Sequence, residues 1–169
     1  MSVSTIGLFP NMQKDKVRDC LPDILALLQK YGLKTLLPED MKDFKAAGYY
    51  SKEAESLAQM EAGISLGGDG TFLQMARHLS PLKIPVFGVN FGKLGFLAET
   101  EMSDFEKALQ KLAGHEFELE ERSQLKASVV KNGLMRLMTW LWPKGIFPNL
   151  RIWNLKLTAN IPAFMPPTG

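Results

Sequence analysis

The run Gly67-Gly68-Asp69-Gly70-Thr71 combines the residue types that phosphate chemistry requires. Its glycines let the backbone turn with positive φ and approach a ligand closely. An apolar run ends at Leu66, and apolar residues recur at helical spacing from Phe72 to Leu79. A strand, a glycine-rich turn and a helix N-terminus form a phosphate site, because free N–H groups and the positive end of the helix dipole point outward.

Asp69 lies at the centre of this turn, where a carboxylate would repel phosphate unless it handled a proton or a metal ion. A carboxylate within hydrogen-bond reach of a hydroxyl can accept its proton, which is typically worth about 10²–10⁴-fold in rate. The turn therefore predicts phosphoryl transfer rather than simple phosphate binding. The sequence contains no Gly-x-x-x-x-Gly-Lys-[Ser/Thr] motif, so P-loop chemistry is not expected.

The elements around the turn alternate between strands and helices. The sequence predicts strands at Val3–Phe9, Leu33–Leu37, the run ending at Leu66, and Ile84–Val89, and helices at Lys14–Tyr31, Phe72–Leu79 and Ser103–Gly114, with a short helix and a mobile loop in Lys42–Met60. This order indicates an α/β fold with a doubly wound parallel sheet. A second glycine-rich turn, Asn90–Gly95, also follows a strand, and ligands bind at such strand ends.

Local signals refine the predicted helices. Gly32 is a natural residue to follow the first helix, and Pro22 inside that helix should kink it or mark a late start. Ser103 and Glu106 form a capping box that predicts the start of the last helix, with Gly114 past its end.

Composition limits the class of protein. The 169 residues are 46% hydrophobic and 22% charged, which are globular values, and a net charge of +2 gives no sign of a nucleic-acid surface. Cys20 is the single cysteine, which excludes an internal disulfide and fits a reducing compartment. No signal peptide or membrane-spanning run is recognisable, so we expect a cytoplasmic protein with neither nucleic-acid nor membrane partners.

The pattern changes after Gly114. Apolar and polar residues alternate from Phe117, and Lys131-Asn132-Gly133 contains a strong hairpin signal. The run Leu134–Pro143 fits neither a good strand nor a good helix, and alternation returns at Ile152–Leu157. We therefore predict an α/β nucleotide-binding domain at residues 1–114 and a fragment of a β domain at 115–169, with an aberrant sequence from about 134.

Three segments make the chain resemble the NAD kinases, which phosphorylate the adenosine ribose 2′-hydroxyl of NAD with ATP. They are Ile6–Asn11, Leu66–Leu73 and the more discriminating Gly88–Glu99. The Gly-Gly-Asp-Gly-Thr turn is shared with diacylglycerol and sphingosine kinases, so a lipid kinase is an alternative that lacks the second turn. The resemblance implies a following β-sandwich, a homodimer or tetramer, and Mg²⁺ accompanying ATP.

The resemblance also implies roles for individual residues. Asp69 would be the general base, Gly68, Gly70 and Thr71 would line the nucleotide phosphates, and Asn90 and Phe96 would shape the NAD pocket. No residue is assigned as a metal ligand. From the residues alone, Asp69 and Asn90 could be turn residues and Phe96 a core residue, whereas Lys93 is read as a solvated charge and His78 and His115 as non-catalytic.

The chain departs from the family pattern after the hairpin. An expected Asn-Asp or Asn-Glu pair that binds NAD is absent, and a Thr-Pro-Thr-Gly-Ser motif survives only as Pro167-Thr168-Gly169. Read one base earlier, codons for Met135–Gly145 can encode Ala-Leu-Asn-Asp-Val-Val-Val-Ala-Lys-Gly, so we hypothesise a shifted frame. We then expect poor solubility and little kinase activity of this chain, and a non-catalytic nucleotide-binding remnant is the rival function. Codons that forbid Asn-Asp in the neighbouring frame would disprove the shift.

Overall fold

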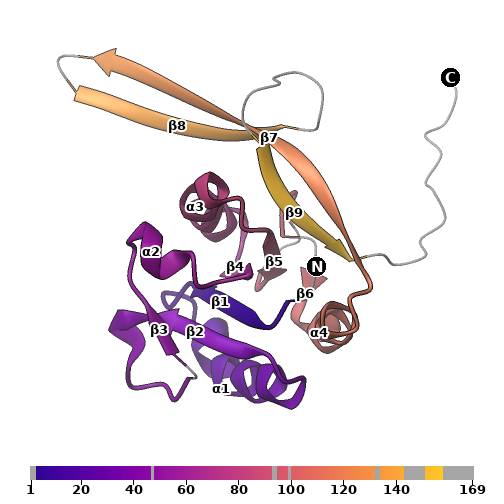
Figure 1. Ribbon diagram of the computed structural model, residues 1–169. Helices are drawn as coiled ribbons and strands as arrows, with labels where there is room; N and C mark the ends of the chain where they lie inside the picture. The colour runs from indigo at the N-terminus through magenta and orange to yellow at the C-terminus, as the bar shows by residue number, and fades with distance from the viewer. Residues whose placement is uncertain are drawn as a thin grey trace, which may run out of the picture.

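A parallel sheet forms the centre of the molecule (Figure 1). The computed structural model describes residues 3–46, 48–92, 95–98, 100–131, 134–142 and 151–157, with side chains up to Glu120. The strand order is β3-β2-β1-β4-β5, and β6 pairs with β5. These strands, all parallel, are β1 Thr5–Pro10, β2 Lys34–Pro38, β3 Gly48–Tyr50, β4 Ala62–Gly67, β5 Val86–Asn90 and β6 Thr100–Glu101.

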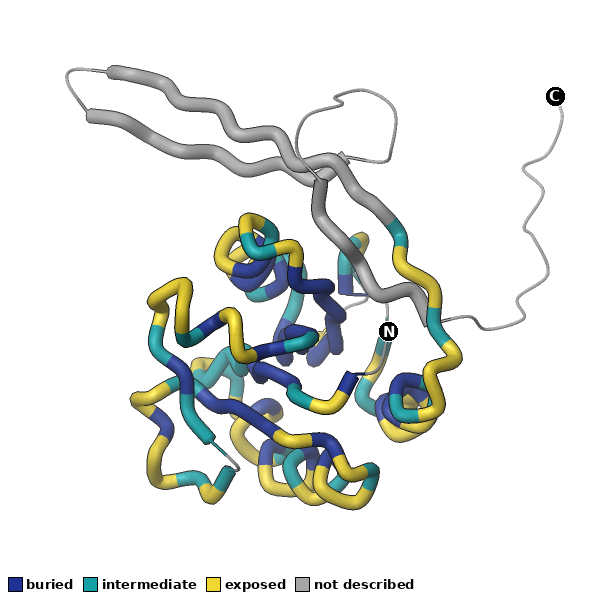
Figure 2. The backbone as a smooth tube through the Cα atoms, viewed as in Figure 1, coloured by how far each residue is buried: buried dark blue, intermediate teal, exposed yellow. Residues whose placement is uncertain are grey.

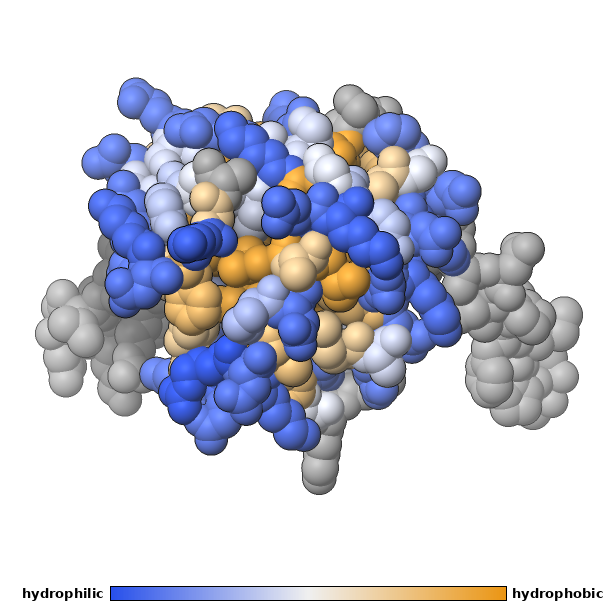
Figure 3. All heavy atoms as spheres, turned by 90° about the horizontal axis from the view of Figure 1, so that it is seen from below, coloured by the Kyte–Doolittle hydropathy of each residue, from blue (hydrophilic) through white to orange (hydrophobic). Residues whose placement is uncertain are grey.

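Helices cover both faces of this sheet, which confirms the predicted α/β fold class. They are α1 Asp15–Lys30, α2 Ala54–Leu57, α3 Asp69–Leu79 and α4 Phe105–Ala113, with short 3₁₀ segments at Glu39–Met41, Ser80–Leu82 and Met102–Asp104. Buried residues of α1 and α4 share one apolar core, and those of α2 and α3 share another. Figure 2 shows the buried strands between these two layers. From the side of α1, apolar surface is framed by hydrophilic side chains (Figure 3).

Helix α1 follows the predicted pattern closely. Its buried residues are Val17, Leu21, Ile24 and Leu28. The helix runs through Pro22 without ending there. Gly32 has a φ of 71°, its N–H donates to the Gln29 carbonyl, and the next N–H donates to the Leu28 carbonyl. These two bonds form a Schellman motif, so the predicted role of Gly32 is confirmed.

Small residues of β4 allow α3 to pack closely on the sheet. A Cβ atom on Gly63 would lie 2.3 Å from Leu79 Cδ1, and one on Gly67 would lie 2.3 Å from Thr71 Oγ1. Ser65, between them, is fully buried. The alternate residues Ala62, Ile64 and Leu66 pack in the core on the opposite face. This alternation lets the turn after β4 pass directly into the first turn of α3.

Two local predictions are wrong. The segment predicted as a short helix and a mobile loop also contains strand β3, whose pairing with β2 is a non-local contact. The predicted capping box at Ser103 does not form, because α4 begins at Phe105 after a 3₁₀ turn. The carboxylate of Glu106 instead accepts a hydrogen bond from Lys30 Nζ, at 2.7 Å, and one from the Tyr31 hydroxyl.

Three further strands follow α4: β7 Phe117–Lys131, β8 Leu134–Trp142 and β9 Arg151–Leu157. Strand β7 pairs antiparallel with both β8 and β9, and β9 also meets β5 at a Val86–Asn154 pair. The Lys131–Leu134 pair confirms the predicted hairpin, whereas Asn132-Gly133 lies outside the described residues. Residues 134–142 show no strand or helix periodicity in the sequence, yet they form strand β8. Backbone pairing with β7 accounts for this strand. The expected domain boundary near residue 114 remains a prediction. Among the helices of the described residues, none has the length and apolar character that a membrane crossing requires.

Candidate active site

The ends of β1, β4 and β5 are joined by backbone hydrogen bonds at one edge of the sheet. The Asn11 N–H, just after β1, donates to the Leu66 carbonyl at 2.9 Å. The Phe91 N–H, just after β5, donates to the Gly67 carbonyl at 2.8 Å. Asn90 Oδ1 accepts the Gly92 N–H at 2.9 Å and so fixes the start of the second turn. The two glycine-rich turns therefore meet, as their positions after neighbouring parallel strands predict.

The Asp69 carboxylate connects the two turns. Asp69 Oδ2 accepts the Phe96 N–H at 3.0 Å, and Oδ1 accepts the N–H groups of Leu97 at 3.1 Å and Ala98 at 3.3 Å. A Cβ atom on Gly95 would lie 2.2 Å from Asp69 Oδ1, so only glycine leaves room for the carboxylate there. The side chain of Asp69 thus faces the Phe96 end of the Asn90–Phe96 turn, and its predicted role as a base remains a prediction.

Counting hydrogen bonds shows what the Asp69 carboxylate has left to offer. An ionised carboxylate has about four acceptor positions, two on each oxygen. The N–H donors of the 95–98 loop take both positions of Oδ1 and one of Oδ2. One position on Oδ2 is left over within this set of bonds. A substrate hydroxyl reaching that oxygen would meet a carboxylate already fixed in position, as general-base geometry requires.

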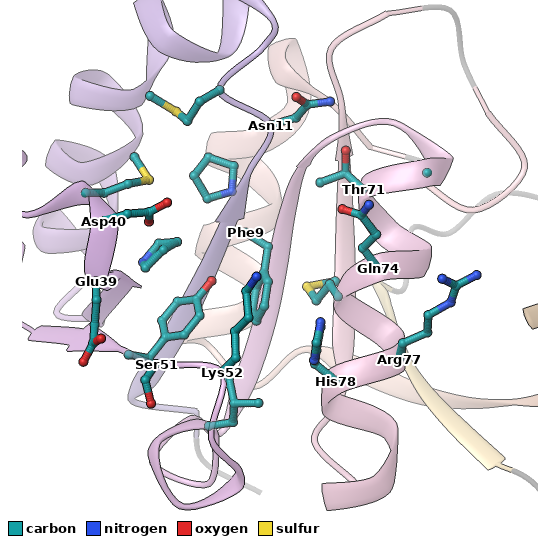
Figure 4. Close-up of a pocket in the computed structure, with 18 of the residues that line it drawn as sticks. Phe9, Asn11, Glu39, Asp40, Ser51, Lys52, Thr71, Gln74, Arg77 and His78 are labelled. Atoms are coloured by element: carbon teal, nitrogen blue, oxygen red, sulfur yellow. The ribbon is translucent and has the colours of Figure 1, made fainter. Parts of the chain in front are cut away.

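A pocket of about 1420 Å³ lies on the other side of the first turn of α3, toward β1–β3 (Figure 4). Its apolar part includes Phe9 and Tyr50, whose ring centroids lie 5.0 Å apart. The Tyr50 hydroxyl donates to the Leu8 carbonyl at 2.8 Å, and burial raises the pKa of this hydroxyl, which keeps it a donor. The pocket therefore has an aromatic wall whose orientation is fixed by the sheet.

Charged and polar side chains line the remainder of this pocket. One side is formed by α3, where Thr71, Gln74 and His78 lie one turn apart with Arg77 beside them. The facing side carries the following polar residues from the segments after β2 and β3: Glu39, Asp40, Ser51, Lys52 and Glu53. A large concave site with an apolar wall and convergent polar groups is typical of small-molecule binding.

The predicted site residues divide between these two regions. Gly68, Gly70 and Thr71 line the pocket. Asp69, Asn90 and Phe96 lie outside its lining, and the backbone N–H of Phe96 donates to Asp69. Phe96 is 91% exposed, so it is no core residue. Asn90 is 5% exposed, and its side chain accepts a hydrogen bond within the second turn. Their roles toward ligands remain predictions, and Lys93 lies outside the described residues.

Lys14 and His78 lie at this edge, although the sequence predicts no role at the site for either. Lys14 lines the pocket and its Nζ donates to the Gly67 carbonyl at 3.1 Å. Its position after a strand and directly before a helix was the available signal. His78, read as non-catalytic, lines the pocket with Tyr50 and Arg77. The sequence spacing of Tyr50 and Arg77 does not indicate that they are neighbours, because the order of the strands in the sheet brings them together.

The described residues contain no group of three or more His, Cys, Asp or Glu side chains placed to hold a metal ion. Mg²⁺ in phosphoryl-transfer sites is usually held by one or two carboxylates together with substrate phosphates. The pocket lining includes the carboxylates of Glu39, Asp40 and Glu53, and none of them is assigned as a metal ligand.

Comparison with known proteins agrees with this geometry. Residues 7–117 match the family described as the ATP-NAD kinase N-terminal domain. The NAD kinase of Natranaerobius thermophilus is 36% identical over 131 residues, covering 76% of this chain and 45% of that protein. The NAD kinase of Burkholderia pseudomallei is 33% identical, covering 76% of this chain and 44% of that protein. The chain therefore spans about half the length of the curated relatives it matches.

The fold is also similar to that of a solved structure. The crystal structure of yeast NADH kinase complexed with NADH aligns with a TM-score of 0.62 at 16% identity, covering 83% of this chain and 47% of that one. At this identity the likeness concerns the fold alone. The matched family and the relatives establish the assignment: the chain belongs to the NAD kinase family, and its α/β part is the N-terminal domain of that family.

Proposed function

We propose that this chain carries the phosphoryl-transfer site of a NAD kinase, which transfers the γ-phosphoryl group of ATP to the adenosine ribose 2′-hydroxyl of NAD. One observation supports this most directly. Asp69 is fixed by three N–H donors at the junction of the two glycine-rich turns, between a large pocket and the exposed Phe96. A base placed between a donor site and an acceptor site is what this reaction requires.

The donor, Mg²⁺–ATP, would occupy the pocket beside α3. Gly68, Gly70 and Thr71 would line its phosphates, as the family resemblance implies. No heavy atom lies within 4 Å of the place where Gly70 would carry a Cβ atom, so a phosphate has room to approach that backbone. The N–H groups of the first turn of α3 would donate to phosphate oxygens, and Mg²⁺ would neutralise charge on the triphosphate.

The acceptor would bind on the other side of Asp69. NAD would contact Phe96 and the turn that Asn90 fixes, which places its ribose near Asp69. The 2′-oxygen forms a bond to the γ-phosphorus, the bond from that phosphorus to the bridging oxygen of ADP breaks, and Asp69 Oδ2 takes the hydroxyl proton. Positioning and charge neutralisation supply the remainder of the rate. A cytoplasmic location and a homo-oligomer are further parts of this proposal.

Ligand titration tests the proposal on the chain as it exists. Calorimetry with Mg²⁺–ATP and with NAD should show binding of both, and an Asp69→Asn variant should retain ATP binding. Any NADP formation should fall about 10²–10⁴-fold in that variant, because an amide cannot accept the proton. Binding of neither ATP nor NAD would refute the proposed function. Binding of ATP without NAD would favour the nucleotide-binding remnant, which the loss of the Asn-Asp pair predicts.

A lipid kinase is less well supported. The curated relatives described above are NAD kinases, and the second turn that separates the two classes is present. Phosphorylation of diacylglycerol or sphingosine by the purified chain would reverse this preference.

A further inference from the structure

Lys14 lies where three loops of the site converge. It directly precedes α1, and its own N–H donates to the Asn11 carbonyl at 3.1 Å. Its Nζ donates to the Gly67 carbonyl at 3.1 Å. The same nitrogen lies 3.5 Å from the places where Gly68 and Gly92 would carry Cβ atoms. The ammonium group thus contacts the first glycine-rich turn and lies beside the second.

The Lys14 ammonium has hydrogen-bonding capacity that the described contacts do not use. Lys14 is half-buried, and among the described residues it forms no ion pair with a carboxylate. The nearby Asp15 pairs with Arg18 instead. A lysine ammonium has three donors, and the Gly67 carbonyl takes one of them. That carbonyl also accepts the Phe91 N–H, so the lysine is not needed to satisfy it.

We propose that Lys14 binds the terminal phosphates of the donor and thereby sets the direction in which the nucleotide lies in the pocket. Thr71 lines the pocket in the first turn of α3, which begins at Asp69, and Lys14 lines it where its Nζ contacts Gly67. Arg77 and His78 lie further along α3 (Figure 4). The γ-phosphoryl group must lie beside Asp69 to be transferred, so the base lies toward His78 and the facing segment after β3. This inference rests on the proposed function, because it assumes a triphosphate donor in this pocket.

The test compares ligands that share a base but differ in phosphates. Calorimetry would give dissociation constants for Mg²⁺–ATP, inorganic triphosphate and AMP with the unmodified chain and with Lys14→Met and Lys14→Arg. The Lys14→Met change should weaken ATP and triphosphate by about tenfold to a hundredfold, as expected for loss of a hydrogen bond to a charged group, and leave AMP within about twofold. Lys14→Arg should restore most of the affinity.

Lys16→Met is the matched control, since Lys16 is exposed on α1 and loses the same charge. It should leave all three ligands unaffected. Equal weakening of AMP and ATP, or no weakening, by Lys14→Met would overturn the inference and leave the proposed function standing. An unmodified chain that bound neither ATP nor triphosphate would overturn both.

Acetylation of the unmodified chain gives a second measurement that needs no variant. Mass spectrometry should show that ATP and triphosphate protect Lys14 from the reagent, whereas AMP does not, and that Lys16 reacts equally throughout. Reaction of Lys14 at the same rate with and without ATP would also overturn the inference.

Discussion

Substitution of Gly95 by alanine should break the contact between the two turns. The added Cβ atom would lie 2.2 Å from Asp69 Oδ1 and 2.8 Å from Oδ2. If the carboxylate yields, it leaves three N–H donors, and a hydrogen bond to a charged group is worth about 1.5–3 kcal/mol, part of which water restores. If the loop yields, overpacking costs typically about 1–3 kcal/mol. The variant will follow the less costly route, which predicts a loss of about 1–3 kcal/mol in the free energy of unfolding.

Urea unfolding followed by far-UV circular dichroism measures this loss, and Gly70→Ala is the matched control. No heavy atom lies within 4 Å of a Cβ at Gly70, which is in the first turn of α3. Alanine there should be neutral or stabilising by up to about 1 kcal/mol, because glycine is a poor helix former. Equal stability of the two variants would refute the steric reasoning.

A double-mutant cycle identifies the partner in the clash. Asp69→Ala removes the atoms that the new methyl group meets, so adding Gly95→Ala to it should cost far less than Gly95→Ala alone. Strictly additive costs would show that the carboxylate is not what makes glycine necessary at position 95.

Three further predictions concern the scaffold. The pKa of Glu61 is lowered mainly because the N–H and hydroxyl of Ser4 donate to its carboxylate, so this stabilisation is complete above about pH 5 and is lost as the pH falls through the lowered pKa. Unfolding curves should show a smaller loss of stability on acidification for Glu61→Gln, and parallel curves would contradict this. Tyr50→Phe removes the donor to the Leu8 carbonyl and should lower the free energy of unfolding by about 1 kcal/mol in urea; an unchanged midpoint would argue against that bond. Gly32→Ala should cost about 1–2 kcal/mol in thermal unfolding and Gly32→Asn less, because φ is 71° with open space around it; equal costs would exclude backbone strain as the cause.

Elements whose signals are local could be predicted from the sequence. The apolar stripe and Gly32 predict α1 within a residue at each end, and the run through Asp69 predicts β4 and α3. The predicted turn is wrong in detail, because α3 begins at Asp69 rather than Phe72, and Gly68 is extended with a φ of −164° rather than a positive φ. The short strand β3 could not be predicted, since its three residues are ordered by pairing with β2. The hydrogen bond of Glu106 could not be predicted either, because its partner Lys30 belongs to a different helix.

The candidate site likewise has features with local sequence signals and features that depend on the fold. The glycine-rich turns and Asp69 stand out because their residue types are unusual in sequence. Other features depend on the order of β1, β4 and β5 in the sheet. They are the hydrogen bonds from the 95–98 loop to Asp69 and the position of Lys14 beside both turns. Contacts between loops that lie far apart in the chain produce no periodic pattern in the sequence. The side chains of residues 134–157, where the frame hypothesis applies, lie outside the described part.

The hydrogen bonds at Asp69 have a consequence for how its variants are interpreted. The two carboxylate oxygens of Asp69 hold the two loops together by hydrogen bonds and also form the proposed base. Replacing Asp69 therefore loosens the architecture and removes the chemistry together, and a rate measured on such a variant mixes the two losses. Gly95→Ala keeps the carboxyl group but shifts it or its loop, so the rate of that variant measures the effect of lost positioning alone.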